Sequence, residues 1–269
     1  MCDEGRYAYH VIDAPDRIAQ ASAREREGGE SLGWDEAIGR TAAALRTTLA
    51  QHGPEAAAVL ASPQMTNEEL FRLRQLFRDD LGIANLEYRV PPREPVYSDD
   101  FLITSDKNPN TRGAEALGLA GSGSQELLAA CRAGRVRFLY ICHHDLARGF
   151  DPDKVKSALS AVDFVAFQGS WDHATARLAD VVLPAAVYAE KDGTFTNCQG
   201  RVQRIGRAVE PLGESLPDLE ILARLAAALG LPPRPPEAEA TFAELARAVA
   251  AFSGLSYASV GASGESLRG

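Results

Sequence analysis

The stretch Ala179-Asp180-Val181-Val182-Leu183-Pro184 decides the fold of this chain. Its short apolar run ends on a proline and predicts a buried strand over 181–183. Residues 190–200 follow, with turn-forming side chains and two glycines. Arg201-Val202-Gln203 then alternates between polar and apolar residues and predicts a second strand. A buried strand, a turn-rich segment and a short strand therefore follow one another closely.

Strands and helices alternate through the residues before this stretch. Apolar runs predict strands at 56–61, 83–90, 136–142 and 162–167. Apolar residues at helical spacing predict helices at 34–50, 66–81, 124–133, 152–161 and 174–178. Strands separated by helices of this length are joined by right-handed crossovers in a parallel sheet. We therefore predict an α/β fold with Rossmann-like parallel-sheet lobes, followed by amphipathic C-terminal helices at 216–229 and 241–252.

The domain organisation follows from a loop-like, proline-rich stretch that separates two parts of the chain. This stretch runs from Pro91 to about Gly123. The units that we expect are an irregular N-terminal segment, a first α/β lobe with its connector, a second α/β lobe, C-terminal helices and a flexible tail, at 1–33, 34–112, 113–215, 216–254 and 255–269.

Composition excludes several classes of protein. Hydrophobic residues make up 45% and charged residues 24% of the 269 residues, which is typical of a globular protein. The net charge of -9 argues against a nucleic-acid partner. No apolar run approaches the roughly 20 residues that span a bilayer, and the N-terminus lacks a signal-peptide profile, so we expect a cytoplasmic location without membrane insertion. The four cysteines, at 2, 131, 142 and 198, have neither disulfide-framework nor zinc-site spacing.

Polar loops follow three of the predicted strands, at 143–148, 168–173 and 184–197. In a parallel sheet these loops lie together at the edge formed by the carboxyl ends of the strands, where ligands bind. His143, His144 and His173 belong to this edge, but the two adjacent histidines would point to opposite sides of an extended strand. We therefore favour capping and surface hydrogen bonding over metal binding for these histidines.

Two other motifs have simpler interpretations. Ser170 lacks the flanking glycines of a nucleophile elbow, so a hydrolytic triad is not favoured. Gly121-Ser122-Gly123-Ser124 precedes a helix but lacks the spacing of a Rossmann or Walker phosphate loop. We interpret this glycine-rich segment as a flexible connector.

The order ADVVLP (179–184), EKDGTFTN (190–197) and GRVQ (200–203) resembles the molybdopterin oxidoreductase superfamily. Within it, the chain looks most like the G subunit of bacterial NADH-quinone oxidoreductases. Further similar pieces are SLGWDEA at 31–37, SP and TNEE at 62–69, and DKNPNTRGA at 106–114, so that the likeness covers most of residues 1–230. The resemblance implies lobes of the molybdopterin oxidoreductase type.

The N-terminal string MCDEGRYAYH resembles the last cysteine ligand, and its flank, of the superfamily's iron-sulfur lobe. The resemblance implies that residues 1–33 are a remnant of that lobe and that a [4Fe-4S] cluster belongs to the full-length protein. The other three cysteine ligands would lie upstream. Cys2 is then either a relic or one ligand of a site that another segment completes, and no cofactor site is complete in this chain.

Two departures from the superfamily pattern bear on function. Cofactor-bearing relatives carry a Gly-x-Asn-Pro turn where this chain has Cys142-His143-His144-Asp145, and they carry a long middle region that is about 30 loop-like residues here. The resemblance then implies that a molybdopterin cofactor is not held. If a pterin is bound, the residues expected to bind it are Gln168, Asp172, Gly193, Asn197 and Arg201.

The resulting first hypothesis is a truncated scaffold, similar to the G subunit, in a respiratory NADH-quinone oxidoreductase. Its partners would be the other subunits of that complex, on the cytoplasmic side of the inner membrane, and the chain alone would not be catalytic. The alternative is a reduced molybdopterin or tungstopterin oxidoreductase, similar to a formate dehydrogenase, with its cofactor at the rim of the second lobe. A third hypothesis is a freestanding α/β module that binds a small anion at the same rim.

Overall fold

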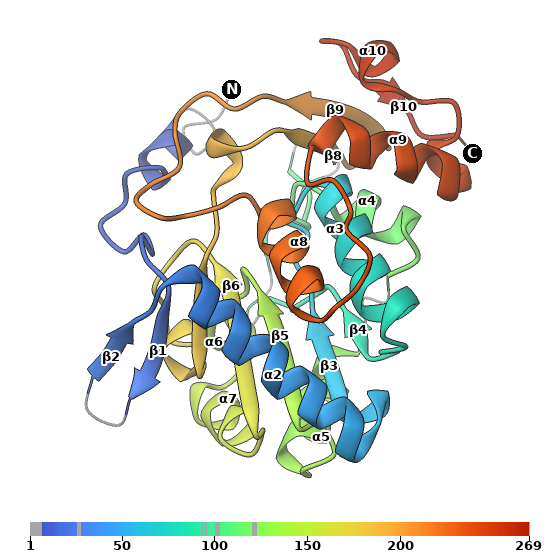
Figure 1. Cartoon of the computed structure of the whole chain (residues 1–269). Coiled ribbons are helices and arrows are strands. Elements are labelled where there is room, and N and C mark those ends of the chain that lie inside the picture. Colours follow the sequence, from blue (N-terminus) through green and yellow to red (C-terminus); the bar gives the residue numbers. More distant parts are fainter. Residues whose placement is uncertain are drawn as a thin grey trace.

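A computed structural model describes residues 7–25, 28–92, 94, 96–99, 103–119 and 123–268 (Figure 1). Cys2, the candidate iron-sulfur ligand, lies outside the described residues. In the described part of the chain, no helix is both long enough and apolar enough to cross a membrane.

A seven-stranded sheet forms the centre of the molecule, in the order β2-β1-β7-β6-β5-β3-β4. Five strands are parallel: β3 (Ala57–Leu60), β4 (Leu86–Glu87), β5 (Phe138–Cys142), β6 (Phe164–Gly169) and β7 (Val181–Pro184). The hairpin of β1 (Ser22–Glu25) and β2 (Gly28–Ser31) adds to β7 in the antiparallel direction. The predicted α/β class with a parallel sheet is confirmed.

Helices cover both faces of this sheet (Figure 1). Alternate residues of β5 divide between two cores: Phe138 and Tyr140 face one core, and Leu139 and Ile141 face the other. The first core contains apolar residues of α2 (Trp34–His52), α3 (Asn67–Arg74) and α8 (Asp218–Ala228), and the second contains those of α5 (Ser124–Arg132), α6 (Leu146–Gly149) and α7 (Pro152–Leu159). The sheet is therefore the middle layer of three.

A small antiparallel sheet lies near the carboxyl ends of the central strands (Figure 1). It consists of β8 (Gly193–Thr196), β9 (Arg201–Ile205) and β10 (Glu265–Ser266). The remaining elements are η1 (Ala8–Val11), η2 (Pro54–Ala56), the π-helix η3 (Gln75–Asp80), α4 (Thr111–Ala116), η4 (Ala176–Leu178), η5 (Tyr188–Glu190), α9 (Ala238–Ala248), η6 (Ala250–Phe252) and α10 (Tyr257–Val260).

Two parts of the predicted organisation differ from the structure. The segments predicted as separate lobes share one sheet, because β3 pairs with β5 over four residues and both strands are buried and apolar. Residues 255–268, expected to be part of a flexible tail, contain α10 and β10 instead. Tyr257 and Val260 are only 5% and 1% exposed, so the burial of apolar side chains holds this segment in place.

Candidate functional site

The carboxyl ends of β5, β6 and β7 border a cavity of about 420 Å³. His143 follows β5, Ser170 and Trp171 follow β6, and Ala186 to Tyr188 follow β7. The other lining residues are Gln64, Pro109, Lys191, Phe195 and Ile205. Most of the lining is apolar, and a few polar groups reach it, which is the usual composition of a small-molecule site.

His143 has an unusual backbone conformation at this edge. Its φ of 56° makes it the single non-glycine residue with positive φ in the described part of the chain. The side chain is 5% exposed, and its Nε2 lies 2.6 Å from Oδ1 of the buried Asp218. A non-glycine residue in this conformation costs about 1–3 kcal/mol, and such strained residues cluster at functional sites. The prediction of surface hydrogen bonding is therefore wrong for His143, because its partner is a buried carboxylate.

Asp218 is the centre of a buried cluster of polar side chains. Its Oδ1 also accepts a hydrogen bond of 2.6 Å from Gln168 Nε2, and its Oδ2 accepts one of 2.6 Å from Lys191 Nζ. The Tyr140 hydroxyl donates in turn to the side-chain oxygen of Gln168. Lys191 Nζ completes the cluster by contacting Glu69 Oε1 at 2.8 Å. One ammonium therefore bridges two carboxylates that come from different helices.

Burial and charge set the protonation states in this cluster. Burial alone would raise the pKa of Asp218, but the Lys191 ammonium and His143 outweigh it and hold this pKa well below the ordinary range. For Lys191 burial lowers the pKa, and the Asp218 and Glu69 carboxylates raise it further than burial lowers it. Burial and the nearby Asp218 charge raise the pKa of Glu69 to about 8. Asp218 is thus the ionised partner of Lys191, and Glu69 is the carboxyl that gains a proton first.

The N-terminus of α3 lies against β8 beside this cluster. Glu68 is fully buried and accepts hydrogen bonds from Thr194 N at 2.8 Å, Thr194 Oγ1 at 2.9 Å and the Tyr257 hydroxyl at 2.9 Å. A Cβ atom on Gly193 would lie 2.5 Å from Thr66 Cγ2, so only glycine allows this approach. The TNEE and EKDGTFTN motifs are therefore in direct contact.

The structure separates the residues that the sequence predicts for a pterin. Gln168 belongs to the buried cluster, and Gly193 lies against α3. Asp172 is exposed and pairs with Arg177 at 3.0 Å. Asn197 and Arg201 lie at the β8–β9 turn, where Asn197 Oδ1 accepts a hydrogen bond from Arg201 N. None of these five residues lines the cavity.

Sequence reasoning missed Lys191, Glu69 and Asp218 as members of one cluster. Lys191 and Glu69 stand inside the quoted motifs, and this was the available signal. Asp218 begins an ordinary helix after a proline, with no pattern that marks it.

The other two histidines at this edge have protein partners. His144 Nε2 contacts the Tyr88 carbonyl at 3.1 Å, and burial lowers its pKa to about 4. His173 Nδ1 accepts a hydrogen bond from Ala176 N, the capping role predicted for it. Among the described residues, no three His, Cys, Asp or Glu side chains gather in a group that could hold a metal ion.

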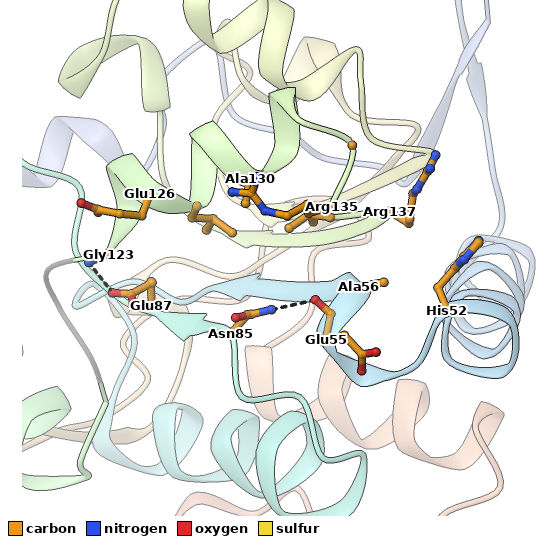
Figure 2. A pocket seen from close by; sticks show the side chains of 13 residues that line it. His52, Glu55, Ala56, Asn85, Glu87, Gly123, Glu126, Ala130, Arg135 and Arg137 are labelled. Atoms are coloured by element: carbon orange, nitrogen blue, oxygen red, sulfur yellow. Dashed lines mark hydrogen bonds between the residues drawn. The ribbon is translucent and has the colours of Figure 1, made fainter.

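A second hollow, of about 710 Å³, lies at the opposite end of the strands (Figure 2). Glu87 and Glu126 lie at one end of it, and Arg137 and His52 lie at the other. Glu87 accepts a hydrogen bond from Gly123 N, and Arg137 pairs with Asp163 at 3.3 Å. Its charged groups are exposed or half-buried, and ligands of parallel sheets bind at the other edge. The cavity beside His143 is therefore the candidate site.

The fold and this site define an α/β protein with a parallel sheet covered on both faces and a ligand-sized cavity at the carboxyl edge. Residues 107–228 match the family model of the molybdopterin oxidoreductases. The chain therefore carries a molybdopterin oxidoreductase domain and belongs to that superfamily.

Curated relatives come from two groups of this superfamily. Over 133 residues, or 48% of this chain, it is 41% identical to F420-dependent formate dehydrogenase 2 subunit alpha of Methanococcus maripaludis. Over 194 residues, or 72% of this chain, it is 32% identical to the NADH-quinone oxidoreductase G 2 subunit of Rhizobium meliloti. These matches span 20% and 22% of the relatives, so the chain corresponds to about a fifth of their length.

A solved structure supports the fold. The acetylene hydratase of Pelobacter acetylenicus superimposes with a TM-score of 0.62, covering 96% of this chain and 67% of the hydratase. The sequence identity is 11%, so the similarity concerns the fold alone.

Proposed function

We propose that this chain is a structural component of a respiratory NADH-quinone oxidoreductase, similar to part of its G subunit. It would pack beside the iron-sulfur electron path, on the cytoplasmic side of the inner membrane, and hold no pterin cofactor of its own. The observation that carries this proposal is the left-handed conformation of His143, whose side chain is bonded to Asp218.

The residues after β5 do not fit a pterin dinucleotide of the kind that the resemblance implies. A glycine at position 143 would adopt the same φ of 56° and leave the edge open. The imidazole of His143 lies there instead, and its Nε2 is hydrogen-bonded to Asp218 Oδ1 at 2.6 Å. The cavity of about 420 Å³ has the volume that one drug-sized ligand needs. A pair of pterin dinucleotides is far larger than such a ligand. These features support a scaffold without a pterin site.

Exposed apolar side chains near the N-terminal segment support a partner surface. Val209 and Leu212 are 42% and 38% exposed, and Tyr9 is 55% exposed. Hydrogen bonds hold these segments together, because Glu190 accepts one from Leu212 N and another from Arg17. Arg17 also donates to the carbonyl of Ile12 in the N-terminal segment. We take this exposed apolar surface as the face that would contact a partner.

Metal and pterin analysis of the purified chain tests the absence of a cofactor. The protein should be produced in a host that makes molybdopterin cofactors, with a cofactor-bearing formate dehydrogenase purified in parallel as the positive control. We expect neither molybdenum, tungsten nor pterin above background in this chain. Stoichiometric metal together with pterin would refute the scaffold proposal.

Co-purification tests the partner. The chain should be co-produced with the other subunits of the NADH-quinone oxidoreductase of its own host. We expect Val209→Glu to reduce recovery with those subunits and to leave the melting temperature unchanged, because Val209 is 42% exposed. Gln199→Glu, at the exposed β8–β9 turn, is the control that adds the same charge elsewhere. Equal recovery of both variants would argue against this surface.

The second candidate is a molybdopterin or tungstopterin oxidoreductase of reduced size, similar to a fragment of a formate dehydrogenase. The observation that favours it is the 41% identity to the alpha subunit of the F420-dependent formate dehydrogenase. Metal and pterin in the analysis above, together with oxidation of formate by the purified chain, would support this candidate.

A further inference from the structure

The cavity beside β5 presents one ring nitrogen of His143 to an occupant. His143 lines this cavity, and its Nε2 is engaged with Asp218 at 2.6 Å. The other nitrogen, Nδ1, makes no hydrogen bond to any residue that the structure describes. Because His143 lines the cavity, Nδ1 is the ring nitrogen that is left for a ligand there. A ligand in the cavity can therefore reach it.

Asp218 determines which nitrogen of His143 carries the proton. The Lys191 ammonium and His143 hold the pKa of Asp218 low against the effect of burial, so its carboxylate is ionised and only accepts hydrogen bonds. The 2.6 Å contact then requires that His143 Nε2 donates. In the neutral imidazole the remaining nitrogen, Nδ1, is an acceptor. The cavity therefore offers a fixed acceptor to a ligand that brings a donor.

The walls of the cavity select the rest of the ligand. Trp171, Tyr188 and Phe195 supply aromatic rings, and Val187 and Ile205 supply aliphatic surface. Aromatic walls favour a flat ring, which stacks or packs edge to face against them. Among the described residues that line the cavity, Lys191 is the one cation, and Glu69 and Asp218 already contact its ammonium. An anion would therefore lose its hydration without gaining a free positive charge.

We propose that this cavity binds an uncharged aromatic compound that carries an O–H or N–H donor. The donor would bond to His143 Nδ1, and the ring would lie among Trp171, Tyr188 and Phe195. This binding site is independent of the scaffold role, since it needs neither a pterin nor a partner protein.

Two isomeric probes test this proposal. 4-Methylphenol carries an O–H donor, whereas methoxybenzene has the same atoms and no donor. Each is titrated at pH 8 into the full ¹⁵N-labelled chain, and the two indole N–H signals are followed by NMR. Trp34, which donates to the Glu214 carbonyl and does not line the cavity, is the internal control for Trp171.

We expect 4-methylphenol to shift the Trp171 signal, leave the Trp34 signal in place, and bind about threefold to tenfold more tightly than methoxybenzene. This ratio is the effect of one neutral hydrogen bond. Benzoate should bind more weakly than 4-methylphenol, because no described residue that lines the cavity supplies a free cation.

Two variants separate the hydrogen bond from the apolar walls. His143→Gly removes the acceptor while keeping a residue that adopts positive φ, and it should bring the affinities of the two isomers to the same value. Tyr188→Ala, at a 42% exposed position in the cavity wall, should weaken both isomers and preserve their ratio. Equal affinity of the isomers for the unaltered protein, an unshifted Trp171 signal, or tighter binding of benzoate would each overturn the proposal.

Discussion

Replacing Lys191 by methionine is the sharpest test of the buried cluster. The change keeps a long apolar chain at a position that is 3% exposed and removes the ammonium that contacts Glu69 at 2.8 Å and Asp218 at 2.6 Å. Removing one partner of a buried ion pair typically costs about 3–5 kcal/mol, because the remaining charge is left without compensation. Asp218 keeps its bonds from His143 and Gln168, so we expect the lower part of this range.

Chemical denaturation at pH 7.5 measures this loss of stability. We expect the free energy of unfolding to fall by about 3 kcal/mol and the melting temperature by about 6–12 °C. The loss should shrink as the pH falls, because protonated carboxyl groups need no ammonium. Lys154→Met, on the exposed side of α7, is the matched control and should change stability by less than about 0.5 kcal/mol.

A second variant asks whether the loss comes from the uncompensated charge. Lys191→Met combined with Asp218→Asn removes one carboxylate together with the ammonium and should recover part of the stability. A loss below about 1 kcal/mol in Lys191→Met, or a loss that does not depend on pH, would refute the reasoning that the ammonium compensates the buried Asp218 carboxylate.

Three further changes test single features of the site. His143→Ala should be less stable than His143→Gly by about 1–2 kcal/mol in urea denaturation. Both variants lose the hydrogen bond to Asp218, but only alanine keeps the cost of a positive φ. Equal stabilities would contradict the left-handed conformation at position 143. Burial raises the pKa of Glu68 from 4.5 to about 7, so the stability that protonated Glu68 contributes is complete below pH 4.5 and is lost as the pH rises through 7. Relative to Glu68→Gln, the unaltered protein should lose up to about 3 kcal/mol of unfolding free energy over that pH range. Parallel plots of unfolding free energy against pH for the two proteins would exclude the raised pKa. Gly193→Ala should lower the unfolding free energy by about 1–3 kcal/mol, because the new Cβ clashes with Thr66. Gly39→Ala, with nothing within 4 Å of the new Cβ, should stabilise α2 by about 0.5–1 kcal/mol. The same melting temperature for both variants would count against the close approach of Gly193 to Thr66.

The parallel sheet could be predicted because each of its strands is marked locally. The run from Phe138 to Cys142 is apolar throughout and lies between two helices, which is the pattern of a strand buried on both faces. The strand order and the union of the two expected lobes could not be read in this way. They depend on the pairing of β3 with β5, which joins residues about 80 positions apart in the sequence.

The edge that carries the site could also be predicted, since His143, Ser170 and Trp171 all follow strands. The chemistry of the edge could not. Burial of His143 depends on Asp218, which lies 75 residues later and comes from a helix on the face of the sheet. A positive φ at histidine has no local signal either, because glycine is the residue that usually marks it. The burial and hydrogen bonding of His143 therefore depend on a residue distant in the sequence, which a local sequence pattern does not reveal.

The bond from Tyr257 to Glu68 has a consequence for how the chain matures during synthesis. The two residues are 189 positions apart, and Lys191 and Glu69 are 122 apart. While a ribosome is still translating, the α3 carboxyl groups emerge long before the groups that bond to them in the folded protein. The growing chain consequently carries two carboxylates that favour water over the interior until β8, α8 and α10 have left the exit tunnel. Docking of α3 against β8 is thus a late event, and a nascent chain released before Tyr257 lacks one of the three hydrogen bonds to Glu68.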